Sequence, residues 1–550
     1  MKMKKRLISI LLAVAMTLSL AACGQTESNS GKENVKQEAN QQGDTSIDSD
    51  APFEETVTIS VAMRETPSTN YADGDSVTDN PWLRAYKERF NIAVEPAFIV
   101  ASDEYETKVN LAIAEKDLPD VFYVTTNQLK QLVEADMIWD LTEVYENYAS
   151  DGVKDIMNYE LDNFESGKFD GKLYGLAKLG FGTTSALNYL WVRNDWMEGL
   201  NLEAPETMDD LAEMCKAFMA EYGAEYGIGV TKDLGNLYNL ACGWGAYPRI
   251  WVENEETGKL EYGAVQPEMK EALAAFAEWY EEGIIDKDFA AMDFAQVNED
   301  IISGKIGATS QYDSWFGYSV GPDLVRQQGT DAYFEAYVIP SATDEQVLFP
   351  VSNAASSYLV VSKKCEHPEA LIKALNFYDY VIKDMIAEEG AEVAQEFQDN
   401  GMLDAVTMSM IDPRTELDDF RLISEAVAKR DDSIVQTANQ KMKYSQCIDW
   451  IDNQNPDAVG YFMQQAPDIS SYACAERMLD NGQVIFNKIG AVTPQTIDEM
   501  GSVLSDILVE GFTKIIMGEE SIDYFETVVE NWMAAGGEQA TIEANEIVGK

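Results

Sequence analysis

The chain has 550 residues, 46% hydrophobic and 10% aromatic, so it can form two or three hydrophobic cores and is not intrinsically disordered. Its formal net charge of −56 argues against binding to nucleic acid or to anionic lipid. A single histidine, His367, excludes His-rich zinc sites and leaves one candidate base for a His-dependent triad. We interpret His367 as a surface residue at a helix start, and we expect no catalytic residue, no metal and no cofactor.

The first 24 residues have the layout of a secretory signal. Basic residues begin it, residues 7–20 are uncharged and mostly apolar, and small residues precede Cys23. The ending Leu-Ala-Ala-Cys resembles a bacterial lipobox, which implies that residues 1–22 are a removed signal peptide and that Cys23 carries the lipid (a palmitate-type anchor). The alternative, a single membrane-spanning helix, fits less well because the apolar run is short and only polar sequence follows.

Residues 23–50 are almost entirely polar, so they cannot contribute to a core. We predict a lipid-anchored, flexible linker that holds a folded body at the extracellular side of the cell membrane. Five cysteines follow the linker, an odd number without CxxC spacing, and we expect free, buried thiols.

Strands and helices alternate at the start of the body. Residues 56–61 alternate between apolar and polar and predict a strand, and Pro81 suits the first turn of a helix through Phe90. A strand within 91–100, a helix over 104–114 and a buried strand over 121–124 follow. This order predicts parallel βαβ units.

Further elements are predicted along the rest of the chain. They are strands at 189–193, 306–309, 337–339 and 357–361, and helices capped by Thr207, running from Pro267 to Gly283, opening at Pro368 and covering 500–516. The apolar stripe of the last helix indicates core packing rather than a cofactor site.

The sequence singles out no catalytic or metal-binding motif. No P-loop or GxGxxG follows a predicted strand. The segment 73–79 has acids at calcium-loop spacing, but Thr78 replaces the required Gly and Arg84 replaces the Glu at the twelfth position. With 96 acidic residues, a glycosidase pair of carboxylates stays open as an alternative.

Aromatic residues in or beside turn-rich segments stand out. A sugar ring has an apolar CH face and a rim of hydroxyls, so flat aromatics with polar neighbours can form a carbohydrate site. A core or hinge role is the alternative for each of them. The candidates are Trp82, Trp244, Tyr247, Tyr312, Trp315 and Trp450.

Several different short motifs are distributed over nearly all of residues 56–550. They include Asp-Leu-Pro-Asp-Val-Phe at 117–122, Gly-Lys-Leu-Tyr-Gly-Leu at 171–176, Trp-Val-Arg-Asn-Asp-Trp at 191–196, and the segments 204–207, 261–270, 282–286, 303–307, 367–370 and 516–518. Together they resemble bacterial extracellular solute-binding proteins of the family 1 type, the lipid-anchored receptors of ABC importers, in their larger, oligosaccharide-type form. Ala177 departs from a common Pro, and the regions 64–80 and 400–490 match poorly, which leaves the substrate open.

This resemblance implies an α/β fold of the periplasmic-binding-protein type II, with two lobes and a ligand cleft between them that closes by hinge motion. Lobe 1 is expected to contain residues 51–180 and 355–430, and lobe 2 residues 181–354 and 431–550. The chain is expected to cross between them near 176–190, 349–362 and 425–450.

Open parallel sheets bind ligands at the carboxyl ends of their strands. On that basis lobe 1 is expected to offer Arg64, Glu65, Asn70, Thr125, Thr126 and Asn127, and lobe 2 Trp244, Tyr247, Tyr312, Asp313 and Trp315. The position of Trp315 resembles that of the stacking tryptophan in maltodextrin-binding relatives, so we expect its loss to weaken binding with little effect on folding. Arg193 and Asp195 belong to a family motif and are interpreted as structural.

The expected function is that of a monomeric, non-catalytic lipoprotein that captures a carbohydrate, an oligosaccharide in the first instance, and delivers it to the permease subunits of an ABC transporter. The alternatives are a secreted carbohydrate-active enzyme, or the same receptor fold binding a peptide or another solute.

Overall fold

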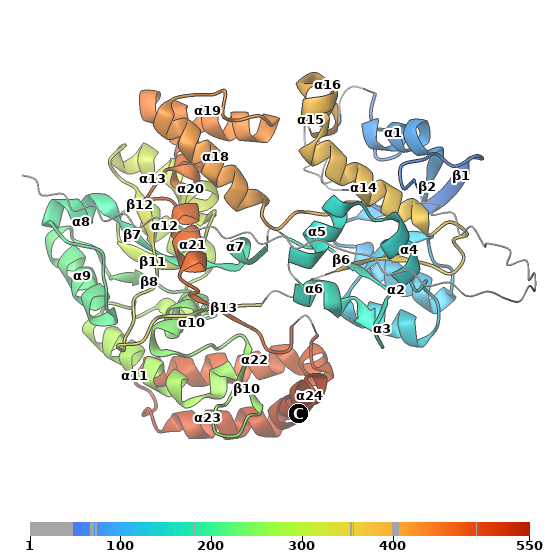
Figure 1. Ribbon diagram of the computed structural model, residues 1–550. Coiled ribbons are helices and arrows are strands. Elements are labelled where there is room, and N and C mark those ends of the chain that lie inside the picture. Colours follow the sequence, from blue (N-terminus) through green and yellow to red (C-terminus); the bar gives the residue numbers. More distant parts are fainter. Residues whose placement is uncertain are drawn as a thin grey trace, which may run out of the picture. The chain divides into compact units, whose positions relative to one another are not determined.

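Two β-sheets, each with its own hydrophobic core, organise the body of the chain (Figure 1). The computed structural model describes residues 48–65, 71, 74–159, 161–180, 182–352, 355, 357–398, 406–490 and 492–550. The expected signal segment, Cys23 and all but the last residues of the expected linker lie outside this part. Within the described residues, no helix has the length and apolar character needed to cross a membrane.

The first sheet has the strand order β2-β1-β3-β14-β6. Its strands are β1 (Val57–Glu65), β2 (Ile92–Ala101), β3 (Val121–Val124), β6 (Leu176–Ala177) and β14 (Tyr358–Val361). β1 runs parallel to β2 and to β3, whereas β14 is antiparallel to β3 and β6. The predicted parallel βαβ units are confirmed.

Three helices around this sheet begin within a residue of the predicted start: α1 (Pro81–Phe90), α2 (Tyr105–Glu115) and α14 (Glu369–Lys383). α1 has Pro81 in its first turn and the Asn80 side chain as its N-cap. The others are α3 (Thr126–Glu134), α4 (Thr142–Tyr148), α5 (Asp151–Tyr159), α6 (Leu161–Ser166), α15 (Met385–Glu388) and α16 (Ala391–Gln398), with a small β4–β5 pair (Lys168–Phe169, Lys172–Leu173). His367 lies just before α14, as predicted, with Nδ1 3.1 Å from a carboxylate oxygen of Glu369.

The second sheet has the order β12-β7-β11-β8. Its strands are β7 (Asn188–Arg193), β8 (Ile228–Gly229), β11 (Ala308–Tyr312) and β12 (Phe334–Tyr337). β11 is parallel to β8 and antiparallel to β7, so the end of β8, the end of β11 and the start of β7 share one edge. Arg193 is buried at the end of β7, and its guanidinium holds Asp195 through two hydrogen bonds of 2.8 and 2.7 Å, which supports their structural interpretation.

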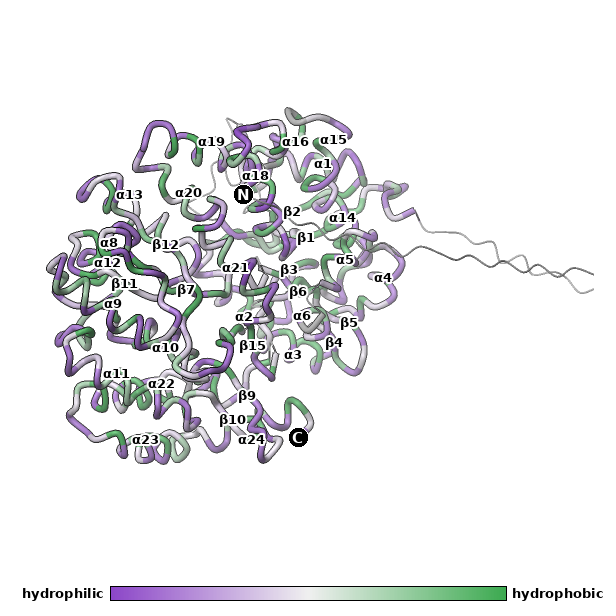
Figure 2. Tube along the Cα trace, turned by 60° about the vertical axis from the view of Figure 1, so that its left-hand side comes forward, coloured by the Kyte–Doolittle hydropathy of each residue, from purple (hydrophilic) through white to green (hydrophobic). Residues whose placement is uncertain are grey.

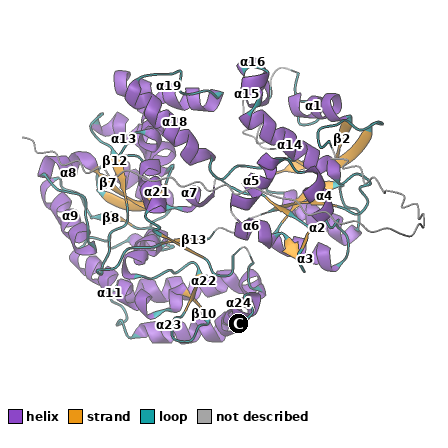
Figure 3. Cartoon of the chain, in the orientation of Figure 1, coloured by secondary structure: helices purple, strands orange, loops and turns teal. Residues whose placement is uncertain are grey.

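Helices make up most of the rest of the body (Figure 3). They are α7 (Gly182–Ala186), α8 (Asn194–Leu200), α9 (Met208–Glu221), α10 (Gly235–Leu240), α11 (Pro267–Glu282), α12 (Phe294–Ile302), α13 (Gly321–Gln328), α18 (Thr415–Lys429), α19 (Ala438–Asn453), α20 (Val459–Gln465), α21 (Ser471–Asp480), α22 (Gln495–Ile516), α23 (Tyr524–Trp532) and α24 (Glu538–Ile547). Short helical turns η1–η6 lie at Ala241–Trp244, Gly263–Val265, Phe289–Ala291, Phe316–Val320, Pro456–Ala458 and Met533–Gly537. Two further strand pairs are β9–β10 (Trp251–Glu253, Leu260–Tyr262) and β13–β15 (Phe349–Val351, Val484–Phe486). Figure 2 shows apolar and polar residues alternating along these helices, as expected of amphipathic helices that cover a core.

The grouping of buried residues shows where the chain passes from one hydrophobic core to the other. The first core contains buried residues from 57–179 and 355–410, and the second contains residues from 187–351, 417–420 and 450–544. A third, smaller cluster consists of Ile423, Ala426, Val427, Val435 and Cys447. The first two expected crossings, near 176–190 and 349–362, stay predictions, and the change from one core to the other falls within the same parts of the chain. The third comes earlier than expected, because Leu417 and Phe420 of α18 pack in the second core, whereas we had placed residues up to 430 in lobe 1. α18 packs against α19 and α21, which the poorly matching sequence of this region did not reveal.

The cysteines after the linker are free and buried, as predicted: Cys215, Cys242, Cys365, Cys447 and Cys474. Burial raises the pKa of each thiol, to about 11 for Cys365 and about 12 for Cys215. These thiols are therefore protonated at neutral pH and behave as small apolar side chains.

Candidate functional site

A polar pocket of about 360 Å³ lies at the carboxyl ends of β8 and β11. Three strand residues, Ser310, Gln311 and Tyr312, line it together with Asn188 at the start of β7. The loop after β8, the first turns of α10 and α12, and Arg249 complete the lining. This volume is in the range of small-molecule sites, and the location is where open α/β sheets bind ligands.

Buried amides hold the pocket wall in place. Asn236 of α10 donates from Nδ2 to Thr309 Oγ1 (3.2 Å) and to the Ser310 carbonyl (3.0 Å). Its Oδ1 accepts the backbone N–H of Thr231 (3.1 Å). Asn236 is almost fully buried, so these bonds tie α10 rigidly to β8 and β11.

Two carboxylates of the pocket accept backbone N–H groups at the starts of helices, and one of them, Asp293, is the N-cap of α12. Asp233 accepts hydrogen bonds from the Thr231 hydroxyl and from the Gly235 N–H (3.1 Å), and Asp293 accepts the Gln296 N–H at the start of α12 (3.0 Å). Burial alone would raise the pKa of Asp233, but these hydrogen bonds and the nearby Arg249 charge lower it overall. Both carboxylates are therefore already engaged by the protein.

Ser310 presents an unused hydrogen-bonding group. Its side chain is fully buried in β11, it lines the pocket, and its Oγ has no hydrogen-bond partner among the described residues. A buried hydroxyl without a partner is costly. Because Ser310 is fully buried in this structure, a ligand hydroxyl reaches it only when the pocket wall moves. Partly buried Tyr312 and the ring of Phe294, which is 41% exposed, add apolar surface beside it.

The edge of the first sheet presents a cation over aromatic rings. Arg64, at the end of β1, lies 5.3 Å from the ring centroids of Tyr105 and Tyr123. The Lys178 ammonium is 4.9 Å from the Tyr123 ring. The Tyr123 hydroxyl donates to the Ser409 carbonyl (3.3 Å), and burial raises its pKa although Arg64 acts in the opposite direction.

The other first-lobe candidates have different surroundings. Thr125 is the N-cap of α3 in a capping box with Gln128, so its hydroxyl is committed to the helix. Thr126 is partly exposed in the first turn of α3, and the Asn127 side chain donates to Asp498 of α22. Glu65 is exposed beside Arg64. Asn70 lies outside the described residues.

Three of the proposed stacking tryptophans are core residues. Trp315 is fully buried, its Nε1 donates to Asn298 (3.0 Å), and its ring contacts Trp191 and Phe334. Trp82 stacks on Tyr378 in the first core, and Trp450 is 8% exposed in the second. A ring enclosed on both faces cannot stack on a ligand, so the structure corrects the expectation for Trp315, Trp82 and Trp450.

Trp244 and Tyr247 are partly buried against the second core and do not line the pocket. Trp244 makes edge contacts with Phe276 and Trp279, and burial raises the pKa of Tyr247 to about 12. Of the second-lobe candidates, Tyr312 alone is among the residues that line it.

Asp313 belongs to a separate buried polar network. Burial raises its pKa, although a hydrogen bond from Tyr472 acts to lower it. The Tyr472 hydroxyl also lies 3.0 Å from Glu416 of α18, which forms an ion pair of 3.1 Å with Lys443. This network joins α18, α19 and α21, whose positions the sequence did not predict.

The sequence reasoning missed every lining residue of the pocket except Tyr312; the missed residues include Ser310, Gln311, Asn236, Asn239, Thr231 and Arg249. A usable signal existed for the first two, because polar residues at 309–311 interrupt an otherwise buried strand. For Arg249 and the α10 amides we find no local signal, since contacts distant in sequence bring them to the strand ends.

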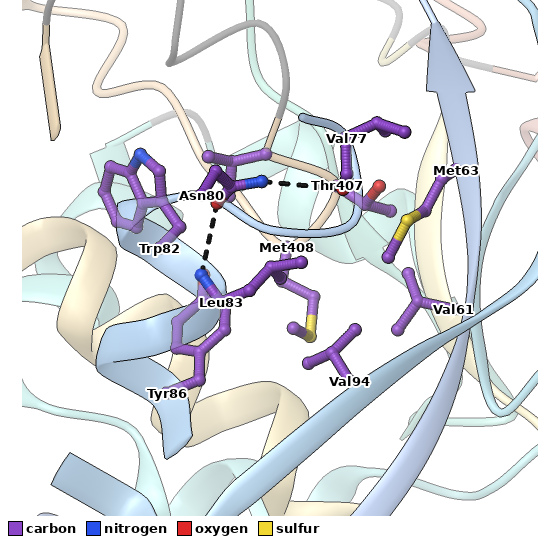
Figure 4. Close-up of a pocket in the computed structure, with 11 residues that line it drawn as sticks. Val61, Met63, Val77, Asn80, Trp82, Leu83, Tyr86, Val94, Thr407 and Met408 are labelled. Carbon is purple, nitrogen blue, oxygen red and sulfur yellow. Dashed lines mark hydrogen bonds between the residues drawn. The ribbon is translucent and has the colours of Figure 1, made fainter. Parts of the chain in front are cut away.

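A second cavity, shown in Figure 4, lies in the first core between β1, α1 and residues 406–408. Its volume is about 20 Å³, enough for a single water. Val61, Met63 and Val94 form its apolar side, and the Asn80 amide is used in capping α1. We therefore interpret it as a packing void.

No cluster of His, Cys, Asp or Glu suited to a metal ion occurs within the described ranges. In the segment with calcium-loop spacing, Arg84 Nη1 lies 2.9 Å from Asp75 and 2.8 Å from Asp79. The guanidinium thus neutralises the acids that a cation would otherwise require.

Comparisons with known proteins agree with this architecture. Residues 72–387 match the family model of the bacterial extracellular solute-binding proteins. Two proteins of Bacillus subtilis (strain 168) are similar: lipoprotein LipO, 23% identical over 483 residues (85% of this chain, 88% of LipO), and the polygalacturonan/rhamnogalacturonan-binding protein YtcQ, 22% identical over 456 residues (80% and 82%). The crystal structure of alginate-binding protein AlgQ2 without calcium ion has the same fold, with a TM-score of 0.55, 15% identity, and coverage of 91% of this chain and 99% of AlgQ2.

Proposed function

Because the chain belongs to the bacterial extracellular solute-binding protein family, we propose that it is a non-catalytic receptor that captures a carbohydrate and delivers it to the permease of an ABC importer. The polar pocket at the ends of β8 and β11 carries this proposal. The chain has a periplasmic-binding-protein fold, which it shares with the solute-binding structures that resemble it.

The chemistry of the pocket supports a carbohydrate as the ligand. The hydroxyl rim of a sugar can be bound by the side-chain amides of the pocket, the Ser310 hydroxyl and the Arg249 guanidinium. The rings of Tyr312 and Phe294 can cover the CH face of the sugar. The names of two similar proteins, which bind polygalacturonan/rhamnogalacturonan and alginate, point to the same class. Micromolar affinity, about −8 kcal/mol, requires only a few such contacts.

We propose that binding works by population shift. A ligand makes most contacts when it touches both the pocket of the second sheet and the Arg64 edge of the first sheet, which requires the two edges to approach each other. Binding therefore favours a closed state, and the permease recognises that state. The crossing segments between the cores, near 180–187, 352–357 and 411–416, are the places where a hinge would act.

The chain is further proposed to act as a monomer at the extracellular face of the cell membrane, anchored by lipid at Cys23. The family and the similarity to a lipoprotein support this location.

Thermal unfolding of the full chain against sugars, neutral and acidic oligosaccharides and peptides tests the proposal. Ligand at about 100 times its dissociation constant should add roughly 2.7 kcal/mol to the free energy of unfolding. We expect a rise with one glycan class and recovery of that glycan intact. Turnover of the glycan would indicate an enzyme, and a rise with peptides alone would replace the carbohydrate assignment.

A further inference from the structure

Three arginines of the described part, Arg64, Arg249 and Arg477, form no ion pair with a carboxylate there. Arg477 instead donates to the backbone carbonyl of Asp468 (3.2 Å). Most arginines of the described part form ion pairs within 4.0 Å: Arg84, Arg89, Arg193, Arg326, Arg414, Arg421 and Arg430. Arg64 and Arg249 form none with any described residue, although the chain has 96 acidic and only 40 basic residues. With so many carboxylates available, an arginine left unpaired at a binding edge indicates a cation kept free for a ligand.

Of these, Arg64 and Arg249 lie at the ligand-facing edges of the sheets. Arg64 ends β1 in the first sheet, and Arg249 lines the pocket of the second. Each guanidinium lies over tyrosine: Arg64 over Tyr105 and Tyr123 (5.3 Å each), and Arg249 over Tyr238 (5.5 Å). An aromatic ring attracts a guanidinium through its π-system and does not itself accept the in-plane N–H groups of the cation.

The acids close to Arg249 do not neutralise it through direct contact. Asp233 and Asp293 each accept hydrogen bonds from backbone N–H groups at a helix start, which compensate their charge. Lys232 adds a second cation to the same pocket. The pocket therefore holds two cations, Lys232 and Arg249, beside two carboxylates, and Arg249 acts on Asp233 at a distance, without a direct ion pair.

We propose that the ligand is a carbohydrate that carries carboxylates, a uronic-acid oligosaccharide, and that Arg64 and Arg249 each bind one of its carboxylate groups. This inference rests on the proposed carbohydrate function and names its substrate class. A planar guanidinium matches a planar carboxylate through two parallel hydrogen bonds, which gives both strength and orientation. A neutral sugar would leave both forks unused.

The test compares each uronate oligosaccharide with its carboxyl-reduced counterpart, which has the same linkage and ring hydroxyls but no charge. The panel contains oligomers of galacturonate and of mannuronate/guluronate, together with a sulfated neutral oligosaccharide. Dissociation constants are measured by calorimetry for the full chain and for Arg64→Gln, Arg249→Gln and Arg430→Gln. Arg430, which pairs with Asp452 on the surface at 2.7 Å, is the matched control for loss of one positive charge.

We expect a uronate to bind at least about tenfold more tightly than its carboxyl-reduced form, and each of Arg64→Gln and Arg249→Gln to weaken uronate binding about ten- to a hundredfold. Arg430→Gln should change the dissociation constant less than about twofold. Unfolding temperatures without ligand establish that the variants are folded, and Arg64→Lys provides a second variant that keeps the charge and loses only the fork.

Five results would overturn the inference. Equal binding of a uronate and its reduced form would remove the role of the carboxylate, as would unchanged uronate binding in both arginine variants. Equal binding of the sulfated sugar would replace carboxylate recognition by general anion binding. Binding of neutral glycans alone would reject the inference and leave the proposed carbohydrate receptor intact, whereas binding of no carbohydrate would reject both.

Discussion

At the scale of single residues, burial decides which aromatic side chains can meet a ligand. Trp315 follows a strand in a turn-rich segment, as a stacking residue would, but its ring is enclosed by Trp191 and Phe334. Replacing a buried tryptophan removes apolar contacts and leaves a cavity.

Trp315→Ala should therefore lower the free energy of unfolding by about 3–5 kcal/mol. Tyr318→Ala is the matched control, because that aromatic is 72% exposed a few residues further along and its loss should cost about 0.5 kcal/mol or less. Denaturant unfolding of both variants checks this, and equal, small losses would contradict the core assignment of Trp315.

Ser310 tests the pocket itself. Its hydroxyl is buried without a partner, so Ser310→Ala removes an unsatisfied group and should leave the stability of the free protein unchanged or slightly higher. The same change should weaken ligand binding about tenfold, because one hydrogen bond in a buried site is lost. Reduced stability together with normal affinity would show that the hydroxyl serves the fold and not the ligand.

Asp419 provides a test by pH. Burial raises its pKa, although hydrogen bonds from Gln440 and the Lys443 charge oppose the shift. Because the folded state binds this proton more tightly than the unfolded state, the stabilising contribution is present below the ordinary value of 3.8 and is lost as pH rises through the raised value.

The wild-type protein should therefore lose free energy of unfolding relative to Asp419→Asn as pH rises from about 4 towards neutrality. Urea unfolding of both proteins across this range measures the difference. A difference that does not vary with pH would show that Asp419 titrates normally.

At the scale of elements, the parts predicted best have local signals. The first helix has Pro81 and an Asn cap, the helix after Thr207 has a capping box, and α11 begins at Pro267 and ends before its C-cap Gly283. The helices between 415 and 480 were not located, because they pack through contacts distant in sequence. One such contact is the crossing of η4 and α20, where Gly317 and Gly460 bring two backbones together.

A Cβ added at Gly460 would lie 2.4 Å from the Gly317 Cα, so Gly460→Ala must push η4 and α20 apart. We expect a loss of about 1–3 kcal/mol, the usual cost of overpacking. Gly501→Ala in α22 is the control, because its nearest neighbour would be Ile497 Cγ2 at an ordinary 3.6 Å and the helix should gain about 0.5–1 kcal/mol. A neutral effect of Gly460→Ala in equilibrium unfolding would contradict the close crossing.

At the scale of the whole molecule, the sequence predicted the fold class and the parallel βαβ units of the first sheet. The ligand-binding residues stay a prediction. Of the residues expected at the strand ends of the second sheet, Tyr312 lines the pocket. The amides of α10 and Arg249 could not be predicted, because the α10 amides reach the strand ends by long-range packing and Arg249 follows a separate loop.

The most direct test of the receptor function is a calorimetric titration of the full chain with the carbohydrate that most raises its unfolding temperature, followed by mass analysis of that carbohydrate. The account predicts saturable binding at one site, a weaker constant in Ser310→Ala, and a ligand recovered unchanged. Cleavage of the ligand, or equal affinity in wild type and Ser310→Ala, would contradict it.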